Sequence, residues 1–343
     1  MEPRVTLSDV AHAAGVSQAT ASRAINGSAN RVVGAKLRER VLAAAAQLGY
    51  APDANAQAMA RGRTTSLGLV VHDIADPYYA SIAAGVTLEA DAEGLLVTLA
   101  DTRFSSERET EIVRMLDRQR VVAIVLAGTR LGEAVDDNRL VEALRAYAHR
   151  GGQVATVAQA LSDLPAVRID NAGAAKDLTR QLVELGYRRF GVVAGPPVHR
   201  TARERVEAIS DELARLSLPL RPDMVVPADL TREGGSAAAA VLLGRAQRPD
   251  VVMACTDLVA IGVLAAARDL GLRVPDDVAV SGFDDIDVAS DVTPPLTTVR
   301  LPLAEVGRLA TRLALDRSGA RSGHLVVGEV VLRASTPPRA TAD

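Results

Sequence analysis

The sequence has a single cysteine, no tryptophan and only 2% aromatic residues. With Cys255 alone, an internal disulfide framework and a metal site built from several thiolates are both excluded. No stretch approaches the roughly 20 uninterrupted apolar residues that span a bilayer, and the first residues lead into no apolar signal-peptide core. We therefore expect a protein that makes no membrane contact and works in the cytoplasm.

The motifs of common catalytic sites are also absent. There is no P-loop, no Gly-x-Gly-x-x-Gly fingerprint and no Gly-x-Ser-x-Gly elbow, and the five histidines have no metal-ligand spacing. Cys255 lies in an apolar run without a recognisable base partner, which favours a buried structural thiol over a nucleophile. We expect no enzymatic activity, no metal and no cofactor.

The charge is unevenly distributed along the 343 residues. Residues 1–62 contain seven basic and four acidic side chains, a surplus of +3, which leaves −6 for the remainder of a chain whose net charge is −3. Only the N-terminal part therefore suits a polyanion. With 48% hydrophobic residues and this length, we expect a small basic domain followed by one or two larger lobes.

The N-terminal segment has the pattern of a helix-turn-helix. The run from Thr6 to Asp9 is a capping box that opens a first helix, Gly15 forces a turn, and Ser17 is placed to cap a second helix from Gln18 to Asn26. Two short helices joined by a glycine turn form this motif. An ordinary helical hairpin with a solvated polar face is the alternative.

A third helix is expected from Ala35 to Leu48, and it should close a small core with the first two. The residues expected to face this core are Leu7, Val10, Ala11, Ala14, Ala21, Ile25, Leu37, Val41, Leu42, Ala45 and Leu48. Asp53 is then placed to cap a short helical segment over residues 54–61, which needs support from other parts of a complex to be stable.

A helix-turn-helix inserts the start of its second helix into the major groove. Arg23 can form a bidentate pair with guanine there, while the helix caps suit the phosphate backbone. The DNA contacts expected from this motif are Thr6, Ser17, Gln18, Ala19, Thr20, Ser22, Arg23 and Asn26.

Beyond Thr65, β-branched runs alternate with amphipathic stretches, which is typical of βαβ units in parallel sheets. The expected strands are residues 67–71, 95–100, 121–127, 154–157, 167–169, 190–194, 251–255 and 278–281. The expected helices are residues 79–93, 107–119, 174–185, 201–216, 258–270 and 303–317. This number of units fits two doubly wound sheets, which bind ligands beyond the carboxyl ends of their strands.

These patterns resemble the lactose-repressor (LacI/GalR) family of bacterial transcription factors. The similarity is carried by Val5 to Ala11, Gly15 to Ser17, Ser22 with Arg23, and Leu48 to Pro52, and it continues to the C-terminus. It implies a ligand-controlled transcriptional regulator, usually a repressor. The implied fold is an all-α helix-turn-helix N-terminal domain plus an α/β periplasmic-binding-protein-like core of two doubly wound parallel-sheet lobes.

The resemblance also implies a hinge helix after Pro52, which pairs with its dimer mate in the minor groove and kinks the duplex with an apolar wedge. It places Asn55, Ala56 and Met59 against DNA. Met59 stands where leucine is usual, so a softer wedge is implied, and a packing role is the alternative. The loop from Gly27 to Val33 is longer than the common form.

An effector site between the lobes is implied as well. Tyr78 and Tyr79 can stack on a sugar or a base, although one of them could instead belong to the core. Arg205 matches the ligand-clamping arginine of the family, with a salt bridge on the helix surface as the alternative. Asp284 matches its hydroxyl-accepting carboxylate, and Thr256 replaces the customary asparagine.

Five further polar residues near predicted strand ends have weaker patterns. Asp257 could touch the ligand or cap the next helix. His72 and Asp101 are included among the expected effector contacts, while for Asp101, Arg103 and Asp170 helix capping or ion pairing is the competing interpretation.

The resemblance divides the chain into a DNA-binding domain (1–52), a hinge (53–65), a first lobe (66–163 plus 292–322) and a second lobe (164–291 plus 323–343). The chain should cross between lobes near residues 161–165, 291–295 and 321–325, which permits hinged closure. The expected partners are double-stranded operator DNA in the nucleoid, a sugar or nucleoside effector, and a second copy of the chain, or more. A free-standing ligand-binding or transport protein is the rival hypothesis, and the basic N-terminal module opposes it.

Overall fold

The computed structural model describes residues 5–26, 33–51, 64–131, 134–316 and 323–339. The chain divides into two compact units, Met1–Thr65 and Ser66–Asp343. No helix within the described segments combines the length and the apolar character needed to cross a bilayer.

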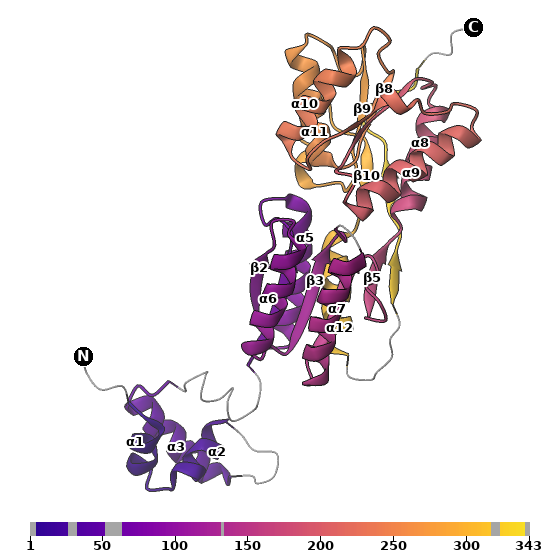
Figure 1. Cartoon of the computed structure of the whole chain (residues 1–343). Helices are drawn as coiled ribbons and strands as arrows, with labels where there is room; N and C mark the ends of the chain where they lie inside the picture. Colours follow the sequence, from indigo (N-terminus) through magenta and orange to yellow (C-terminus); the bar gives the residue numbers. More distant parts are fainter. Residues whose placement is uncertain (1–4, 27–32, 52–63, 132–133, 317–322, 340–343) are drawn as a thin grey trace. The chain divides into compact units, whose positions relative to one another are not determined.

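The described part of the N-terminal unit contains α1 (Leu7–Ala13), α2 (Gln18–Asn26) and α3 (Ala35–Gln47) (Figure 1). The capping box forms as predicted, because the Thr6 side chain accepts from the Asp9 N–H and the Asp9 carboxylate accepts from the Thr6 N–H. The helices pack through small side chains. The buried core residues are Val10, Ala11, Ala14, Ala21, Ala24, Val41, Ala44 and Ala45.

Two leucines predicted to face this core are exposed instead. Leu42 is 42% exposed and Leu48 is 36% exposed. On α3 the buried stripe runs through Val41, Ala44 and Ala45, so Leu42 stands beside the stripe. Leu48 is the C-cap residue and lies past the last helical turn. The prediction that these two leucines close the core is therefore wrong.

The first lobe of the second unit contains a six-stranded parallel sheet with the order β11-β5-β4-β3-β1-β2. Its strands are β1 (Ser66–Val71), β2 (Leu96–Asp101), β3 (Ala123–Gly128), β4 (Gln153–Ala158), β5 (Ala166–Ile169) and β11 (His324–Val326). Its helices are α5 (Pro77–Ala92), α6 (Ser106–Arg118), α7 (Ala134–His149) and α12 (Leu303–Leu315).

Alternate residues of each central strand enter opposite cores of this lobe. Leu67 and Leu69 of β1 pack in the cluster that contains α5 and α12, whereas Val70 packs with α6 and α7. Helices α5 and α12 approach closely because of two glycines. A Cβ on Gly85 would lie 1.9 Å from the Ala304 carbonyl oxygen, and one on Gly307 would lie 2.2 Å from that of Ile82.

The second lobe contains a four-stranded parallel sheet with the order β7-β6-β8-β9. Its strands are β6 (Phe190–Ala194), β7 (Val225–Pro227), β8 (Val251–Ala254) and β9 (Ala279–Ser281). Helices α8 (Asn171–Glu184) and α9 (Arg200–Arg215) cover one face, and α10 (Arg232–Leu243) and α11 (Asp257–Asp269) cover the other (Figure 1). Short 3₁₀ turns occur at η1 (Pro222–Met224) and η2 (Asp287–Ala289).

The crossings between the lobes occur later in the chain than predicted. Strands β5 and β11 belong to the first sheet, because β5 pairs with β4 and β11 pairs with β5. The first and last crossings therefore follow Ile169 and Val326. At the middle crossing, Leu296 packs in the core of the second lobe, and β10 (Thr298–Arg300) follows it, paired antiparallel with β12 (Glu329–Val331).

Candidate recognition helix and effector pocket

The predicted DNA contacts of α2 lie away from the core of the N-terminal unit. Ala21 and Ala24 are buried, whereas Gln18 and Ala19 are exposed. Ser17 caps the helix as predicted, since its Oγ accepts from the Thr20 N–H at 3.2 Å. This arrangement leaves the start of α2 open to a partner.

The side chains further along α2 form local hydrogen bonds. The Arg23 Nε donates to the Ala19 carbonyl at 3.0 Å, and the Asn26 amide donates to the Ser22 hydroxyl at 3.3 Å. Arg23 therefore lies along its own helix and is half-buried. The hinge residues Asn55, Ala56 and Met59 lie outside the described residues.

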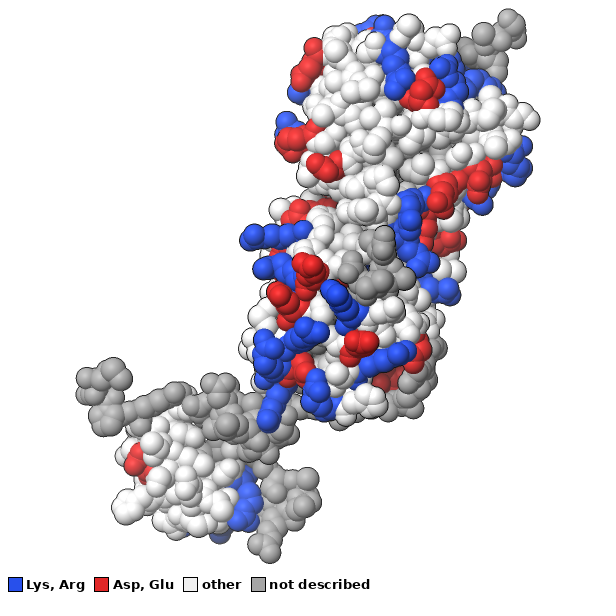
Figure 2. Space-filling model, viewed as in Figure 1, with Lys and Arg blue, Asp and Glu red and all other residues white. Residues whose placement is uncertain are grey.

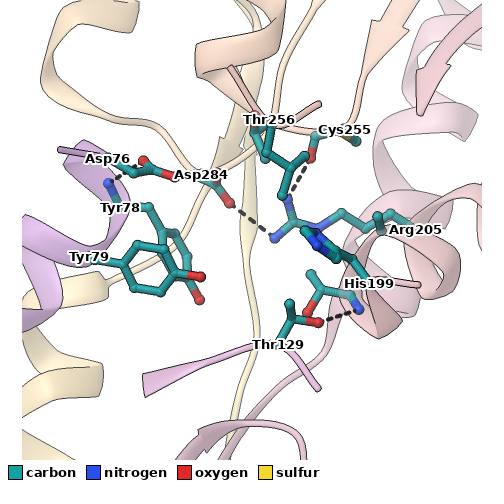
Figure 3. Close-up of a pocket in the computed structure, with 12 residues that line it drawn as sticks. Asp76, Tyr78, Tyr79, Thr129, His199, Arg205, Cys255, Thr256 and Asp284 are labelled. Atoms are coloured by element: carbon teal, nitrogen blue, oxygen red, sulfur yellow. Dashed lines mark hydrogen bonds and ion pairs between the residues drawn. The ribbon is translucent and has the colours of Figure 1, made fainter. Parts of the chain in front are cut away.

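In the second unit, a cavity of about 40 Å³ lies between the two lobes (Figure 3). The first lobe contributes Asp76, Tyr78, Tyr79 and Thr129, and the second contributes His199, Thr201, Ala202, Arg205, Leu230, Cys255, Thr256 and Asp284. Most of these residues follow the carboxyl ends of β1, β3, β6, β8 and β9, where doubly wound sheets place their ligands. We refer to this cavity as the interlobe pocket.

Arg205 is buried in the wall of this pocket, with 3% of its surface exposed. Its Nε donates to Asn171 Oδ1 at 3.0 Å, its Nη1 donates to the Cys255 carbonyl at 2.6 Å, and its Nη2 donates to Asp284 Oδ1 at 3.0 Å. The guanidinium carbon also lies 3.7 Å from the ring centre of Phe283. A surface salt bridge is therefore excluded, and the guanidinium is held in one orientation.

Burial raises the pKa of the two carboxyl groups that line the pocket. It raises the pKa of Asp284 to about 7, an effect that the neighbouring Arg205 opposes. It raises the pKa of Asp76 to about 6, although the Asp76 side chain accepts a hydrogen bond from the Tyr78 N–H. Both groups therefore change charge close to neutral pH.

Both tyrosines line the pocket opposite Arg205 and His199 (Figure 3). Their rings meet edge to face, with centroids 5.0 Å apart. Tyr79 is also part of the buried core, whereas Tyr78 is half-buried. Tyr78 therefore offers more ring surface to a ligand.

Thr256 lines the pocket and also caps α11, because its Oγ1 accepts from the Val259 N–H at 3.3 Å. Asp257 neither lines the pocket nor caps α11. It is fully buried and accepts from the Thr298 hydroxyl at 2.6 Å and from the Ile286 N–H at 2.9 Å. Asp257 thus braces the loop that carries Asp284, which corrects both sequence interpretations of this residue.

His72 and Asp101 were predicted as effector contacts but do not line the pocket. His72 is buried, with its ring nitrogens 2.7 Å from the Thr102 hydroxyl and 2.7 Å from the Thr129 carbonyl. Asp101 accepts from the backbone N–H groups of Ile74 and Arg103. Their polar atoms are used to hold loops of the first lobe. Asp170 caps α8.

His199, which precedes α9, was not predicted as a site residue. It is 6% exposed, lines the pocket, and its Nδ1 has no hydrogen-bond partner in the described part of the chain. Burial lowers the pKa of His199 to about 4, so the ring is neutral. Its ring stacks on Phe104 of the first lobe at 5.0 Å. A ligand in the pocket can satisfy this nitrogen.

The two lobes touch at the start of α9. The Thr201 N–H donates to the Thr129 hydroxyl at 2.9 Å, and the Arg200 N–H donates to the Arg130 carbonyl at 3.1 Å. Gln159 donates to the Thr201 hydroxyl at 2.8 Å. A cavity of about 40 Å³ holds only a few waters, at roughly 10–15 Å³ each. A sugar therefore enters only if these contacts separate.

Comparison with known proteins identifies both units. Residues 6–53 match the model for bacterial regulatory proteins of the lacI family, and residues 179–336 match a periplasmic binding protein-like domain. The HTH-type transcriptional repressor CytR of Escherichia coli is 32% identical over 98% of this chain and 97% of its own.

Two solved structures extend these similarities. A Lac repressor dimer bound to operator and an anti-inducer aligns with a TM-score of 0.85 at 27% identity, over 98% of this chain and all of the other. The regulator CelR in complex with cellobiose aligns with a TM-score of 0.70 at 31% identity, over 97% of this chain and all of the other.

Proposed function

The chain belongs to the LacI family of bacterial regulatory proteins, and we propose that it is a homodimeric repressor whose affinity for operator DNA is set by a sugar or nucleoside in the interlobe pocket. Proteins of this family are DNA-binding transcriptional regulators. The observation that carries the proposal is the joining of a helix-turn-helix to a pocket with a buried Arg205–Asp284 pair. Its place of action is nucleoid DNA in the cytoplasm.

The DNA-binding step uses the exposed start of α2. Gln18, Ala19, Ser22 and Arg23 face base edges in the major groove of the complex, where Arg23 has to leave the Ala19 carbonyl, and Thr6, Ser17, Thr20 and Asn26 contact the DNA backbone. Hinge residues Asn55, Ala56 and Met59 enter the minor groove at the operator centre. A gel-shift titration against DNA upstream of its own gene tests this step. Equal affinity for that DNA and for random competitor would refute it.

The effector is an uncharged molecule rich in hydroxyl or amino groups. Three of the five N–H groups of Arg205 already donate to Asn171, Cys255 and Asp284, and an anionic ligand would also meet the carboxyl groups of Asp76 and Asp284. The groups offered to a ligand are the carboxyl oxygens of Asp76 and Asp284, the hydroxyls of Tyr78 and Tyr79, and the Nδ1 of His199, which donates or accepts according to the tautomer of the ring. CelR in complex with cellobiose is a relative with such a ligand.

A thermal-shift screen of neutral sugars and nucleosides, with phosphorylated sugars as the contrast, tests the effector class. A neutral compound should raise the melting temperature, and the increase should shrink in Asp284→Ala and His199→Ala but not in the exposed control Arg203→Ala. A response to phosphorylated sugars alone would overturn this assignment.

The dimer is supported by exposed apolar side chains near the edge of the first sheet. Strand β2 is an edge strand on which Leu96 is 73% exposed and Leu99 is 38% exposed, and Leu88 of the adjacent α5 is 59% exposed. A second copy would cover these groups. Analytical ultracentrifugation of Leu88→Glu/Leu96→Glu should show monomers, and an unchanged dimer would place the interface elsewhere.

Effector binding changes DNA affinity through the relative orientation of the lobes. The crossings around β10 and β12 permit rotation, and the contacts of Thr129 and Arg130 with α9 hold one orientation. A coupling of about 1–3 kcal/mol changes DNA affinity about 5- to 150-fold. Cys255 is not a nucleophile in this proposal, since burial raises the pKa of its thiol to about 12 and keeps it protonated.

A further inference from the structure

A second cavity, of about 290 Å³, lies in the second lobe at the end opposite the interlobe pocket. Its walls come from the residues around the start of β6, the residues before β8, and the segment between α9 and β7. The interlobe pocket lies at the other, carboxyl ends of the same strands. The two cavities share no lining residue, so occupation of one does not require the other.

The inner wall of this second cavity is apolar. Phe190 and Met224 are buried, and Leu218 and Leu220 are half-buried beside them. Pro249 completes this wall. The surface can therefore cover a ring or an aliphatic chain.

The rim of the cavity is strongly basic. Four arginines, Arg188, Arg189, Arg221 and Arg248, line it together with the amide of Gln247, and no carboxylate does. In Figure 2, basic side chains gather at the end of the second lobe near the C-terminus. A cavity lined by four arginines, with no acidic side chain among its described lining residues, favours an anion.

Only two of these arginines are neutralised by neighbouring acids. Arg189 donates to Asp250 and Arg221 donates to Asp223. These two aspartates are shared with a further arginine each, Arg339 and Arg245 respectively. The local balance of charge therefore stays positive.

The guanidinium groups of the other two rim arginines have no acidic partner in the described part of the chain. Arg188 donates to the carbonyls of Val183 and Tyr187. Arg248 makes no hydrogen bond or ion pair with any described residue and meets Asp277 only at longer range. The guanidinium groups of two of the arginines that line this cavity thus have no carboxylate partner among the described residues, which leaves them available to a phosphate or carboxylate.

We propose that this second cavity binds a small organic anion, with its phosphate or carboxylate held by Arg188 and Arg248 and its apolar body against Phe190 and Leu220. The arginines provide the charge-assisted hydrogen bonds, and the apolar wall selects a ligand that is more than a bare ion. The site is separate from the effector pocket and does not depend on which sugar or nucleoside binds there.

Phenyl phosphate is the probe, titrated into the full chain by isothermal titration calorimetry. We expect saturable one-to-one binding with a dissociation constant below about 1 mM. Inorganic phosphate lacks the apolar body and phenol lacks the charge, so both should bind at least about tenfold more weakly. Equal binding of all three compounds, or no saturable binding of phenyl phosphate, overturns the proposal.

The variant Arg188→Gln/Arg248→Gln should bind phenyl phosphate about 10- to 100-fold more weakly, because two charge-assisted contacts are lost. The control Arg114→Gln/Arg118→Gln makes the same change of net charge on exposed positions of α6 and should bind normally. A thermal melt shows that each variant is folded. If both variants lose the same affinity for phenyl phosphate, the loss comes from the change in net charge, and the assignment to this cavity is overturned.

Discussion

The DNA-binding unit and the effector-binding unit place their functional residues in opposite environments. The core of the first consists of valines and alanines, and its proposed DNA contacts lie outside that core. In the second, the proposed ligand residues Arg205 and Asp284 are as buried as the leucines around them. In the first unit, function and stability can be altered separately, whereas in the second the binding site is itself a structural element.

The largest effect is expected from removing the buried guanidinium. Arg205→Ala breaks three hydrogen bonds and leaves Asp284 without its partner, so the free energy of unfolding should fall by about 3–5 kcal/mol. Urea denaturation followed by circular dichroism measures this. Arg203→Ala, on the exposed side of α9, should cost less than about 0.5 kcal/mol. Equal losses would contradict the structural role of Arg205.

The pH dependence of stability provides a second test of whether the buried site residues stabilise the fold. The pKa of Asp284 is raised by burial from 3.8 to about 7, so between about pH 4 and pH 7 the folded state holds a proton that the unfolded state releases. Stability should therefore fall as pH rises through this window, by up to about 1.4 kcal/mol per pH unit. Asp284→Asn should flatten the slope in urea titrations. An identical slope in wild type and variant would assign the pH response to other groups.

In the N-terminal unit, the matching test is a change in its small core. Val10→Ala removes two buried methyl groups and should lower the free energy of unfolding by roughly 2 kcal/mol. This is a large share of the total stability of so small a unit. Gel shifts should show lost DNA binding while the main calorimetric transition of the core unit stays in place. Leu42→Ala, at an exposed position, is the control. Similar losses in both would mean that Leu42 is covered in the active protein.

Base recognition should respond without any loss of folding. Arg23→Ala should weaken operator binding by about 1–3 kcal/mol and relax its sequence preference. Competition gel shifts measure both quantities. Arg40→Ala, an exposed arginine on α3, controls for the loss of one positive charge. If both variants discriminate operator from random DNA as well as wild type, Arg23 reads no base.

The smallest effect concerns the capping box. Thr6→Ala removes the side-chain acceptor at the start of α1 and should cost about 1 kcal/mol in the N-terminal unit, whereas Thr6→Ser keeps the acceptor. Thermal melts of the two variants give the comparison. A serine variant as unstable as the alanine variant would show that the lost methyl, rather than the cap, matters.

The sequence predicted best those elements whose signals are local. The strand predicted at 190–194 and the helix predicted at 18–26 have the same bounds in the structure, because each is a periodic run with clear ends. Helix α10, rich in alanine and glycine, was missed because it lacks a clear apolar period. The short strands β10 and β12 were missed because they exist only through their pairing with each other.

In the candidate site, too, residues with a local sequence signal were predicted and residues defined by tertiary contacts were not. The resemblance indicated Arg205 and Asp284, and the structure places both in the interlobe pocket. His72 was selected for its position after a strand, but Thr102 and Thr129 use both of its ring nitrogens. His199 was missed because its burial against Phe104 of the other lobe, with Nδ1 unpartnered among the described residues, is visible only in the folded structure. Such a signal comes from tertiary packing and has no local pattern.

The pairing of β11 with β5 determines when each unit can fold during synthesis. Leu325 adds its strand beside Arg168, and α12 packs on α5, so the first lobe is incomplete until the ribosome has synthesised residue 326. The three helices of the N-terminal unit need only the first fifty residues or so. A nascent polypeptide thus carries its DNA-reading part long before the part that senses metabolites.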